Sequence, residues 1–399
     1  MTTIQSNDPP TTPNLPDQYP EINNWDDLDI DTNLLRGIYA YGFEKPSPIQ
    51  KKAITPIINN RDIIAQAQSG TGKTATFSIG LLSRINLLER FPQAIVLSPT
   101  RELATQSTRV IRSIGSVMEG LTVQTLVGGT YIDEDISIFK KNVPHVIVGC
   151  PGRVFDMMRR NIISCKNIKI VVIDEADEML CSEFKEQLYT IFQYFNTDIQ
   201  VALFSATLPE NIYEITDKFM RTPVKIIVKA EQLTLEGISQ YFIALNDDQH
   251  KYATLKSLYG VISLSQCIIY CNSVKRVVDL YEAMKEDNFP VCCINSSMDK
   301  DARELSMEDF RKGKYRVLIS SNVTARGIDV QQVSVVINFD VPKDVHTYIH
   351  RIGRSGRWGR KGTGINLITR RDVYKIKEIE EYYACQIAEF PENYSTFMK

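Results

Sequence analysis

Short apolar runs rich in β-branched residues recur along the first half of the chain, and segments with helical spacing separate them. The runs are Ala94–Ser98, Val123–Val127, Val146–Val148, Ile168–Ile173 and Val201–Phe204. Continuous apolar runs of this length are typical of parallel strands that are buried on both faces. Because the spacing leaves room for a crossover helix between successive strands, the pattern predicts a doubly wound α/β sheet.

A second series of strand-like runs follows a looser stretch at residues 229–240. Its members are Gln266–Tyr270, Val291–Ile294, Val317–Ser320, Val333–Phe339 and Gly364–Thr369. We therefore expect tandem domains of one architecture over residues 23–228 and 241–399, with residues 229–240 as a short linker. Residues 1–22 are rich in Pro, Thr, Asn and Asp, and we expect them to form a disordered acidic tail.

The length and composition agree with more than one globular domain. A chain of 399 residues, of which 43% are apolar and 24% charged, can bury ordinary cores. The first 35 residues hold seven of the 48 acids and none of the 46 lysines and arginines, so the rest of the chain carries a net charge of +5. Such an excess gives little long-range attraction, and we expect any polyanion to bind in a local groove.

The eight cysteines are scattered without a Cys-x-x-Cys pair, which argues against a zinc site and indicates reduced thiols inside a cell. No signal peptide is evident, and no apolar run approaches the roughly 18 residues that span a bilayer. We expect a monomer without membrane contact in the cytoplasm. The nucleus stays open as an alternative, because basic pairs such as Lys140-Lys141 are too short to identify a nuclear signal.

A glycine-rich turn at Ala65–Thr74 joins a predicted strand to a predicted helix. Such a turn directs several backbone N–H groups and the positive end of a helix dipole at one point, which suits a phosphate. The sequence matches the phosphate-loop pattern G-x-x-x-x-G-K-[ST], except that Ala67 replaces its first glycine. Lys73 would contact the β- and γ-phosphates and Thr74 would bind Mg²⁺. The alternative is a loop whose glycines only turn the chain.

Two acids, Asp174 and Glu175, follow directly after one of the apolar runs. Asp174 could hold Mg²⁺ through water, and Glu175 could polarise the attacking water. An acidic turn at a strand end is also common without any chemistry. Combined with Lys73 and Thr74 in the same α/β pattern, the acids indicate hydrolysis of ATP with Mg²⁺ as cofactor.

The second predicted domain contains His350–Arg357, followed by Arg360 and Lys361. These residues include five cations between positions 351 and 361 and no acid. Their three-residue spacing places them near one helical face, which a solvated basic stripe would also explain. The sharper hypothesis is that some of them reach across a cleft to the γ-phosphate as arginine fingers, so that hydrolysis requires the domains to close.

Other residues at the predicted strand ends and turns suit a nucleic acid or an adenine. Glycines allow close approach of a backbone and arginines pair with phosphates, which gives sequence-independent binding. The candidates are Arg101, Gly128, Gly129, Gly152 and Arg153. Gln50, in a proline-flanked turn after Phe43, carries the donor and acceptor that suit the adenine edge. Taken singly, each of these residues also fits a plain surface turn.

As a set, the motifs resemble those of the DEAD-box RNA helicases, and most closely the translation initiation factor 4A subfamily. The resemblance runs from about Trp25 to Lys399. It is carried by Phe43–Gln50, Ala67–Thr74, Pro99–Leu103, Asp174–Asp177, Ser205–Thr207, Ala325–Asp329 and His350–Arg357. It implies RecA-like domains that close on ATP, Mg²⁺ and single-stranded RNA, with protein activators of the scaffold type as further partners.

The resemblance also assigns roles to individual residues. The nucleotide would be bound by Trp25, Phe43, Gln50, Ser69, Gly70, Thr71, Gly72, Lys73, Thr74, Gly327 and Asp329. Catalysis would rest on Lys73, Asp174, Glu175, Arg354 and Arg357, with Thr74 and Asp174 at the metal. RNA would contact Pro99, Thr100, Arg101, Gly128, Gly129, Pro151, Gly152, Arg153, Ser321 and Thr324. Hydrolysis would be coupled to unwinding through Ser205, Thr207, His350 and Arg351.

The chain departs from the family pattern at a few positions on the expected RNA or interdomain side. Cys150 replaces a threonine, Asn322 replaces an aspartate, Asn295-Ser296 replaces a His-Gly pair and Lys300 replaces a glutamine. The resemblance therefore implies ordinary ATP binding with weaker or altered coupling to RNA.

We expect an ATP-dependent RNA helicase that locally unwinds short duplexes. An ATP-gated RNA clamp or assembly platform with little unwinding is one alternative, since clamp-like relatives share these motifs. A DNA-directed translocase is a second alternative, which the Asp174–Asp177 and Gln50 motifs disfavour.

Overall fold

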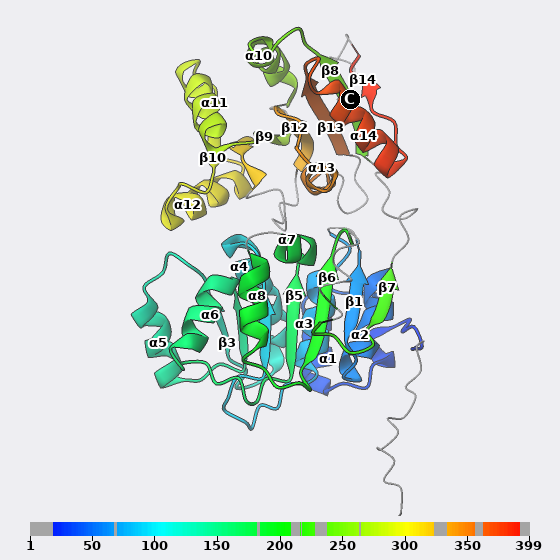
Figure 1. The fold of residues 1–399 in the computed structure, drawn as a ribbon, viewed down its shortest axis with the longest axis vertical. Helices are drawn as coiled ribbons and strands as arrows, with labels where there is room; N and C mark the ends of the chain where they lie inside the picture. The colour runs from blue at the N-terminus through cyan, green and yellow to red at the C-terminus, as the bar shows by residue number, and fades with distance from the viewer. Residues whose placement is uncertain are drawn as a thin grey trace, which may run out of the picture.

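The computed structural model describes residues 19–67, 70–181, 184–208, 216, 218–227, 238–262, 265–322, 333–355 and 362–391. Two lobes stack one above the other (Figure 1). The first lobe comprises the elements from η1 to β7, and the second lobe comprises those from β8 to β14.

The first lobe is a seven-stranded sheet with the order β3-β4-β2-β5-β6-β1-β7. Its strands are β1 (Ile63–Gln66), β2 (Ala94–Leu97), β3 (Val123–Leu126), β4 (Val146–Gly149), β5 (Ile170–Asp174), β6 (Gln200–Ser205) and β7 (Val224–Ile227). Its helices are η1 (Trp25–Asp27), α1 (Thr32–Ala40), α2 (Pro48–Ile58), α3 (Lys73–Leu82), α4 (Arg101–Ile114), η2 (Gly115–Val117), α5 (Ile132–Lys141), α6 (Pro151–Arg159), α7 (Ala176–Cys181) and α8 (Phe184–Phe192). All recorded strand pairs are parallel, for example Ala65 of β1 beside Phe204 of β6.

The second lobe repeats this architecture with the strand order β10-β11-β9-β12-β13-β8-β14, again in parallel pairs. Its strands are β8 (Ile238–Ala244), β9 (Gln266–Tyr270), β10 (Val291–Ile294), β11 (Val317–Ser320), β12 (Val333–Asn338), β13 (Gly362–Ile368) and β14 (Ala388–Glu389). Its helices are α10 (His250–Ile262), α11 (Val274–Glu286), α12 (Lys300–Arg311), α13 (Val345–Ile352) and α14 (Val373–Tyr383). The predicted fold class, tandem doubly wound parallel sheets, is confirmed.

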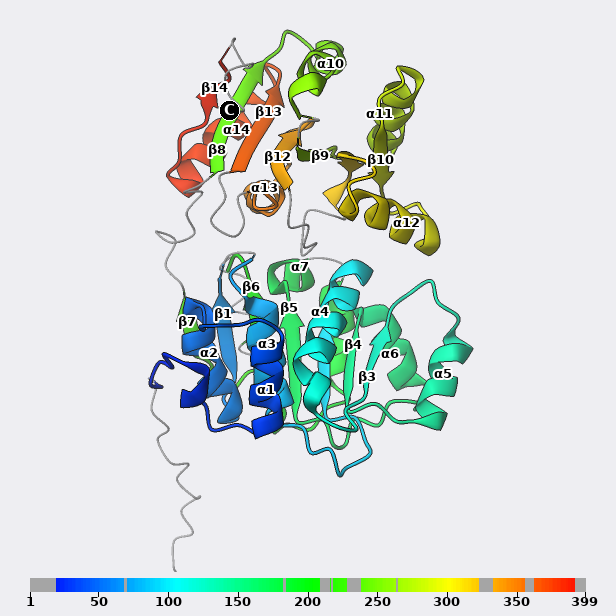
Figure 2. The same cartoon turned by 180° about the vertical axis from the view of Figure 1, so that it is seen from behind.

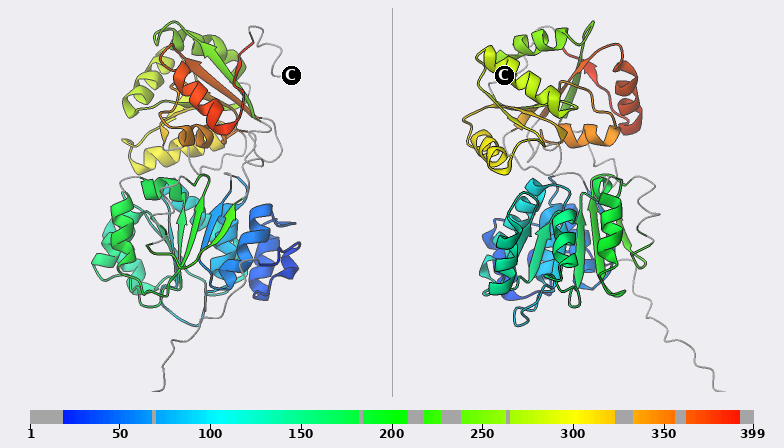
Figure 3. Two further views of the ribbon diagram at one scale, coloured as in Figure 1. Left: turned by 45° about the vertical axis from the view of Figure 1, so that its right-hand side comes forward. Right: turned by 60° about the vertical axis from the view of Figure 1, so that its left-hand side comes forward.

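Alternation along the strands builds a separate core on each face of a sheet. In β2, Ala94 and Val96 pack with the side chains of α1 to α4, whereas Ile95 and Leu97 pack with those of α6 to α8. Figure 1 shows α6 and α8 on one face of the first sheet, and Figure 2 shows α1, α3 and α4 on the other. Figure 3 shows the same layering from the sides, with helices flanking the sheet of each lobe. The central strands such as β2 and β5 are therefore covered on both faces, and the polar groups of interest lie at strand ends.

The boundaries differ from the prediction in three places. Strand β8 begins at Ile238, inside the stretch assigned to the linker, whose residues 229–237 lie outside the described part. Strands β7 and β14 were not predicted, because both are short edge strands and β14 has only two residues. Ile22, at the end of the predicted disordered tail, is buried, and its N–H donates to Lys51 O. Residues 1–18 lie outside the described part.

Within the described residues, no helix is both long and apolar enough to span a bilayer.

Candidate functional site

The glycine-rich turn connects β1 to α3, as the sequence predicts, and α3 starts at Lys73 rather than at Ala75. Gly70 and Gly72 have φ angles of 86° and 100°, a left-handed backbone that glycine adopts without strain. Lys73 is 6% exposed, and its Nζ lies 3.7 Å from Glu175 Oε1. It makes no hydrogen bond within the described residues, so a buried ammonium group faces the turn without an acceptor at hydrogen-bond distance.

Gln50 closes one side of this turn. It is 2% exposed, and its Oε1 accepts a hydrogen bond of 2.7 Å from Ser47 N in a capping box at the start of α2. Its Nε2 lies beside Gly72, where an added Cβ would come within 2.6 Å of it. The predicted adenine residue therefore packs directly against the phosphate loop.

Of the two predicted aromatic residues, only Phe43 is partly exposed. Trp25 is fully buried, with its ring centroid 6.0 Å from that of Phe43. Tyr41 lies on another side of Phe43, with ring centroids 4.7 Å apart. Trp25 is thus placed to support Phe43, and Phe43 offers the accessible ring surface.

Asp174 and Glu175 lie at the end of β5, both 3% exposed. Glu175 N donates to Asp174 Oδ1 at 3.0 Å, and Glu175 has a positive φ of 50°. Burial, and then the neighbouring charge of Glu175, raise the pKa of the Asp174 carboxyl. Two buried acids beside one lysine leave an excess of negative charge, which a divalent cation would offset.

A hydrogen-bonded network crosses from the first lobe to the second. Asp177 N donates to Ser205 Oγ at 3.2 Å, and Thr207 Oγ1 donates to Asp177 Oδ2 at 2.9 Å. The same carboxylate oxygen lies 2.9 Å from His350 Nε2 of α13. All four side chains are buried. The structure thus brings the predicted coupling residues Ser205, Thr207 and His350 together, with Asp177 as their common partner.

Arg354, one of the predicted arginine fingers, lies just beyond α13. Arg354 is 2% exposed, and its Nε donates to His350 O at 3.1 Å, which ties it to the residue that meets Asp177. Arg357 lies outside the described residues, as do Ser69, Thr324, Gly327 and Asp329. Arg351, predicted as a coupling residue, points instead into the interior of the second lobe.

Most of the predicted RNA residues line one cavity of about 520 Å³ at the carboxyl ends of the first sheet. They are Pro99, Thr100, Arg101, Gly128, Gly152 and Arg153. Gly129 has a φ of 78° and is covered by the Arg101 guanidinium, which an added Cβ would meet at 2.5 Å. Pro151 starts α6 beside the cavity, while Ser321 lies in the second lobe, where its N–H approaches Ile294 O at 3.4 Å.

Arg153 and Cys150, both at this cavity, have surroundings that limit what they can offer to a ligand. Arg153 pairs with Asp135 and also donates to Thr130 Oγ1 and Thr130 O, so its guanidinium fixes the loop that contains Gly129. Cys150 is the N-cap of α6 without a side-chain hydrogen bond, and burial raises the pKa of its thiol to about 12. It therefore supplies neither a hydroxyl nor a thiolate to the cavity.

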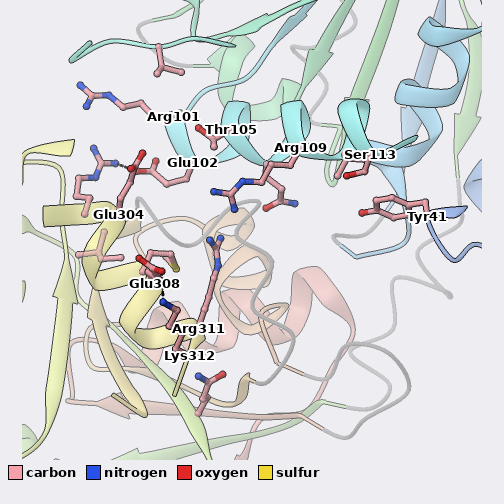
Figure 4. A pocket seen from close by; sticks show the side chains of 17 residues that line it. Tyr41, Arg101, Glu102, Thr105, Arg109, Ser113, Glu304, Glu308, Arg311 and Lys312 are labelled. Atoms are coloured by element: carbon pink, nitrogen blue, oxygen red, sulfur yellow. Dashed lines mark ion pairs between the residues drawn. The ribbon is translucent and has the colours of Figure 1, made fainter. Parts of the chain in front are cut away.

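An ion pair joins the lobes at the edge of the cavity. Arg303 Nη2 of α12 lies 2.5 Å from Glu102 Oε1 of α4, with side chains 10% and 20% exposed. On the other side of this pair, a groove of about 800 Å³ separates α4 from α12. Figure 4 shows Arg109 and Arg311 extending into it from the two helices.

The residues present fit a nucleoside triphosphate with a divalent cation. The positive-φ glycines form a cradle for phosphate at the start of α3, Lys73 Nζ offers donors, and the buried acids lie within its reach. Thr74, the second residue of α3, and Asp174 are the residues that would hold the cation.

The sequence reasoning missed several residues of this site. Asp177 was seen only as part of an acidic motif, although its place three residues after Asp174 was a usable signal. Glu102 and Arg303 belong to different lobes, so nothing in the linear pattern relates them. Asp135, the partner of Arg153, shows no pattern of its own.

The chain matches two family models. Residues 47–215 match the DEAD/DEAH box helicase model, and residues 250–359 match the helicase conserved C-terminal domain. The chain is 48% identical over 372 residues to Eukaryotic initiation factor 4A of Caenorhabditis elegans, covering 93% of this chain and 92% of that protein. It is 49% identical over 370 residues to ATP-dependent RNA helicase eIF4A of Lodderomyces elongisporus, covering 93% of each.

Solved structures share the arrangement of both lobes. S. cerevisiae Dbp5 bound to RNA and ADP BeF3 superposes with a TM-score of 0.87 at 35% identity, covering 94% of this chain and 97% of that one. Mss116p bound to ssRNA and AMP-PNP gives 0.84 at 25% identity, covering 94% and 81%. The motifs, the matched family models and the identity over nearly the whole length agree, and the chain belongs to the DEAD/DEAH box helicases.

Proposed function

We propose that this protein is an ATP-dependent RNA helicase of the initiation factor 4A kind, which binds single-stranded RNA and locally separates short duplexes as it hydrolyses ATP. The observation that carries the proposal is the buried contact between Asp177 and His350. It connects α7, which follows the acids at the end of β5, to the helix that precedes Arg354, so closure of the lobes and completion of the site are one event.

Within this proposal, each lobe contributes part of the chemistry. Lys73 binds the β- and γ-phosphates, and Glu175 orients the attacking water and takes its proton. Arg354 and Arg357 of the second lobe stabilise the charge that develops on the transferred phosphoryl group. Mg²⁺, held by Thr74 and Asp174, would neutralise charge on the triphosphate. Phe43 and Gln50 hold the adenine, with Trp25 behind Phe43.

RNA follows the cavity at the carboxyl ends of the first sheet. Main-chain groups near Gly128 and Gly152, together with Arg101, suit phosphate oxygens and carry no base information. Arg153 acts indirectly in this scheme, since Asp135 and Thr130 already hold its guanidinium. Relatives of known structure were solved with RNA, which supports RNA as the ligand.

We further infer helicase domains over residues 23–228 and 238–399, a monomeric protein, cytoplasmic action and regulation by a scaffold-type protein. One of the similar structures is Dbp5 bound to Gle1, which supports the last point. The upper limit of the linker is moved to residue 237, because β8 begins at Ile238.

The test is ATP hydrolysis with and without single-stranded RNA, in the wild type and in variants at His350. His350→Ala removes the interdomain hydrogen bond, so it should bind ATP on the first lobe but lose RNA-stimulated turnover. His350→Gln keeps a donor of similar reach and should retain part of the stimulation. If His350→Ala were stimulated by RNA as strongly as the wild type, the closure mechanism would be wrong.

A second measurement separates the helicase from the clamp. Strand displacement on a short RNA duplex is compared with ATP-dependent retention of single-stranded RNA. Displacement within the time of a few turnovers supports the helicase, whereas long retention without displacement supports the clamp. Stimulation by RNA but not by DNA of the same sequence excludes the DNA-directed translocase.

A further inference from the structure

The guanidinium of Arg351 is fully buried in the second lobe and uses all of its donors. Nε and Nη2 donate to Asn322 Oδ1 at 3.0 and 2.7 Å, and Nη2 also donates to Asn272 Oδ1 at 2.7 Å. Nη1 donates to Asn338 Oδ1 at 3.1 Å and to Asp340 O at 2.8 Å. All five N–H groups of the side chain therefore have partners, and every acceptor is a neutral amide or carbonyl oxygen.

This cage is one end of a longer buried polar chain. Asn338 Nδ2 donates to Asn366 Oδ1, Asn366 Nδ2 contacts Tyr348 Oη at 3.3 Å, and Tyr348 Oη donates to Gln240 Oε1. The chain thus runs from β8 through β13, α13 and β12 to the residues that follow β9 and β11. We call it the amide chain. It fixes α13 against the second sheet without using a single charged acceptor side chain.

The charge of Arg351 has no carboxylate at ion-pair distance among the described residues. Among the carboxylates, Asp340 raises the pKa of Arg351 the most. Its carboxylate already pairs with Arg276 at 3.0 Å and with Lys251 at 3.6 Å. Burial lowers the pKa of Arg351 to about 10, so the group stays protonated at neutral pH. A full positive charge thus lies inside the second lobe without a carboxylate partner, with the Tyr270 ring centroid 5.2 Å from its Cζ.

Asn322 is the one exposed member of the cage, whereas Asn272 and Asp340 are half-buried and Asn338 is buried. It accepts two of the five hydrogen bonds through a single oxygen, in the geometry that a carboxylate would take up with both oxygens. A carboxylate at this exposed position would keep part of its hydration and would compensate the charge of the guanidinium. The choice of amide or acid at position 322 therefore decides whether the charge of Arg351 is paired with an opposite charge.

The buried charge lies on the helix that completes the nucleotide site. His350 points from α13 toward Asp177 of the first lobe, and the next residue, Arg351, points into the second sheet. Figure 1 shows α13 on the side of the second lobe that faces α7. A triphosphate bound between the lobes carries several negative charges, so an uncompensated cation behind α13 favours it through a medium of low dielectric constant.

We propose that Asn322 is a positioning residue that holds α13 through neutral hydrogen bonds, leaves Arg351 uncompensated, and thereby strengthens binding of the anionic nucleotide. The binding half of this inference rests on the proposed function, whereas the structural half does not. Compared with a carboxylate at position 322, Asn322 leaves the second lobe less stable and the cleft between the lobes more positive.

The test compares Asn322→Asp, Asn322→Ala and the control Asn288→Asp in the full-length protein. Asn288 is exposed, lies in the same lobe and has a φ of 60°, which aspartate tolerates, so the control adds the same charge without touching the cage. Thermal unfolding is measured without nucleotide, and the affinity for a fluorescent ATP analogue is measured at fixed salt and Mg²⁺.

Asn322→Asp should raise the unfolding temperature by about 2–4 °C, because two hydrogen bonds become charge-assisted on both sides. The same variant should weaken binding of the analogue about three- to tenfold, because the new anion compensates the charge of Arg351 and repels the phosphates. Asn322→Ala should lower the unfolding temperature while leaving the affinity within about twofold of the wild type, since Arg351 keeps its charge. Asn288→Asp should change neither quantity.

The inference is overturned if Asn322→Asp lowers the unfolding temperature, or if it weakens the affinity no more than Asn288→Asp does. Equal loss of affinity in Asn322→Asp and Asn322→Ala also overturns it, because position rather than charge would then control binding. If the wild type bound no ATP at all, the proposed function would fail. The unfolding comparison, which needs no nucleotide, would still decide the structural half.

Discussion

The ion pair between Glu102 and Arg303 joins helices of different lobes, and its removal should shift the protein toward an open state. We consider the single substitutions Glu102→Gln and Arg303→Gln, which keep most of each side chain and remove its charge. Both residues lie away from the phosphate loop, so binding of ATP to the first lobe should persist in each variant.

The magnitude follows from the geometry of the pair. At 2.5 Å, with side chains 10% and 20% exposed, the contact is a charge-assisted hydrogen bond shielded from most of the solvent. Glu102 Oε2 and Arg303 Nε have no hydrogen-bond partner within the described residues, so the pair has one strong bond rather than two. Such a bond contributes about 1.5–2 kcal/mol, the lower part of the range for charged groups. Its loss lowers the equilibrium constant for closure by about ten- to thirtyfold.

Closure is measured by energy transfer between dyes at residues 88 and 374, where Leu88 is 92% and Tyr374 is 73% exposed, one in each lobe. ATP analogue and RNA are added, and the closed fraction is compared across the two single variants and the double variant. Because the pair is one interaction, the double variant should close about as well as either single variant. The pair Glu308–Lys312 within α12, exposed by more than half on both sides, serves as a control cycle with coupling near zero.

Additive losses in the Glu102–Arg303 cycle would refute the reasoning, since they would show that each residue acts alone. A charge-reversed protein with Glu102→Arg and Arg303→Glu offers a second check, because it should close better than either single reversal.

Three further predictions concern the site itself. Glu175→Gln removes the group that takes the proton of the attacking water, so ATP turnover should fall by at least about a hundredfold. RNA should remain bound in the presence of ATP, as measured by filter binding. Unimpaired turnover would contradict the role assigned to Glu175. Cys150→Thr supplies the missing N-cap hydroxyl of α6 and should raise the free energy of unfolding by about 0.5–1 kcal/mol, measured in urea; no gain would show that the helix start is already satisfied. The pKa of Asp174 is raised in the folded protein, so the folded state holds its proton longer than the unfolded chain does, and the stability of the nucleotide-free protein should fall as pH rises from the ordinary value near 3.8. Asp174→Asn should remove that part of the slope, and a variant with the wild-type slope would contradict the shift.

The central strands of each sheet could be predicted from the sequence, whereas the edge strands β7 and β14 could not. Buried central strands such as β2 and β5 read as continuous apolar runs, because both faces are covered. Strand β7 has exposed residues at two of its four positions and lacks that signal. In strand β8, the exposed Ser239 lies between the buried residues Ile238 and Gln240. This alternation is a weaker signal than a continuous apolar run, so the start of the strand was assigned to the linker.

The site could be predicted wherever its residues are neighbours in the sequence. The turn at Lys73 and the acids at Asp174 are local motifs, and parallel strands bring their ends to one edge of the sheet. Contacts between lobes could not be predicted, because the pairing of Asp177 with His350 depends on how two separately folded sheets dock. The contact of Arg153 with Asp135 was missed for a similar reason, because the sequence around an arginine does not identify the acid with which it pairs.

The left-handed backbone at Glu175 has a consequence for how this protein can change. A left-handed backbone costs a residue with a side chain about 1 kcal/mol or more of stability, and glycine in place of Glu175 would remove this cost. The substitution Glu175→Gly would also remove the carboxylate that the reaction needs. It would therefore stabilise the fold and abolish turnover. At Glu175, the stability of the fold and the activity of the enzyme therefore place opposite demands on one residue.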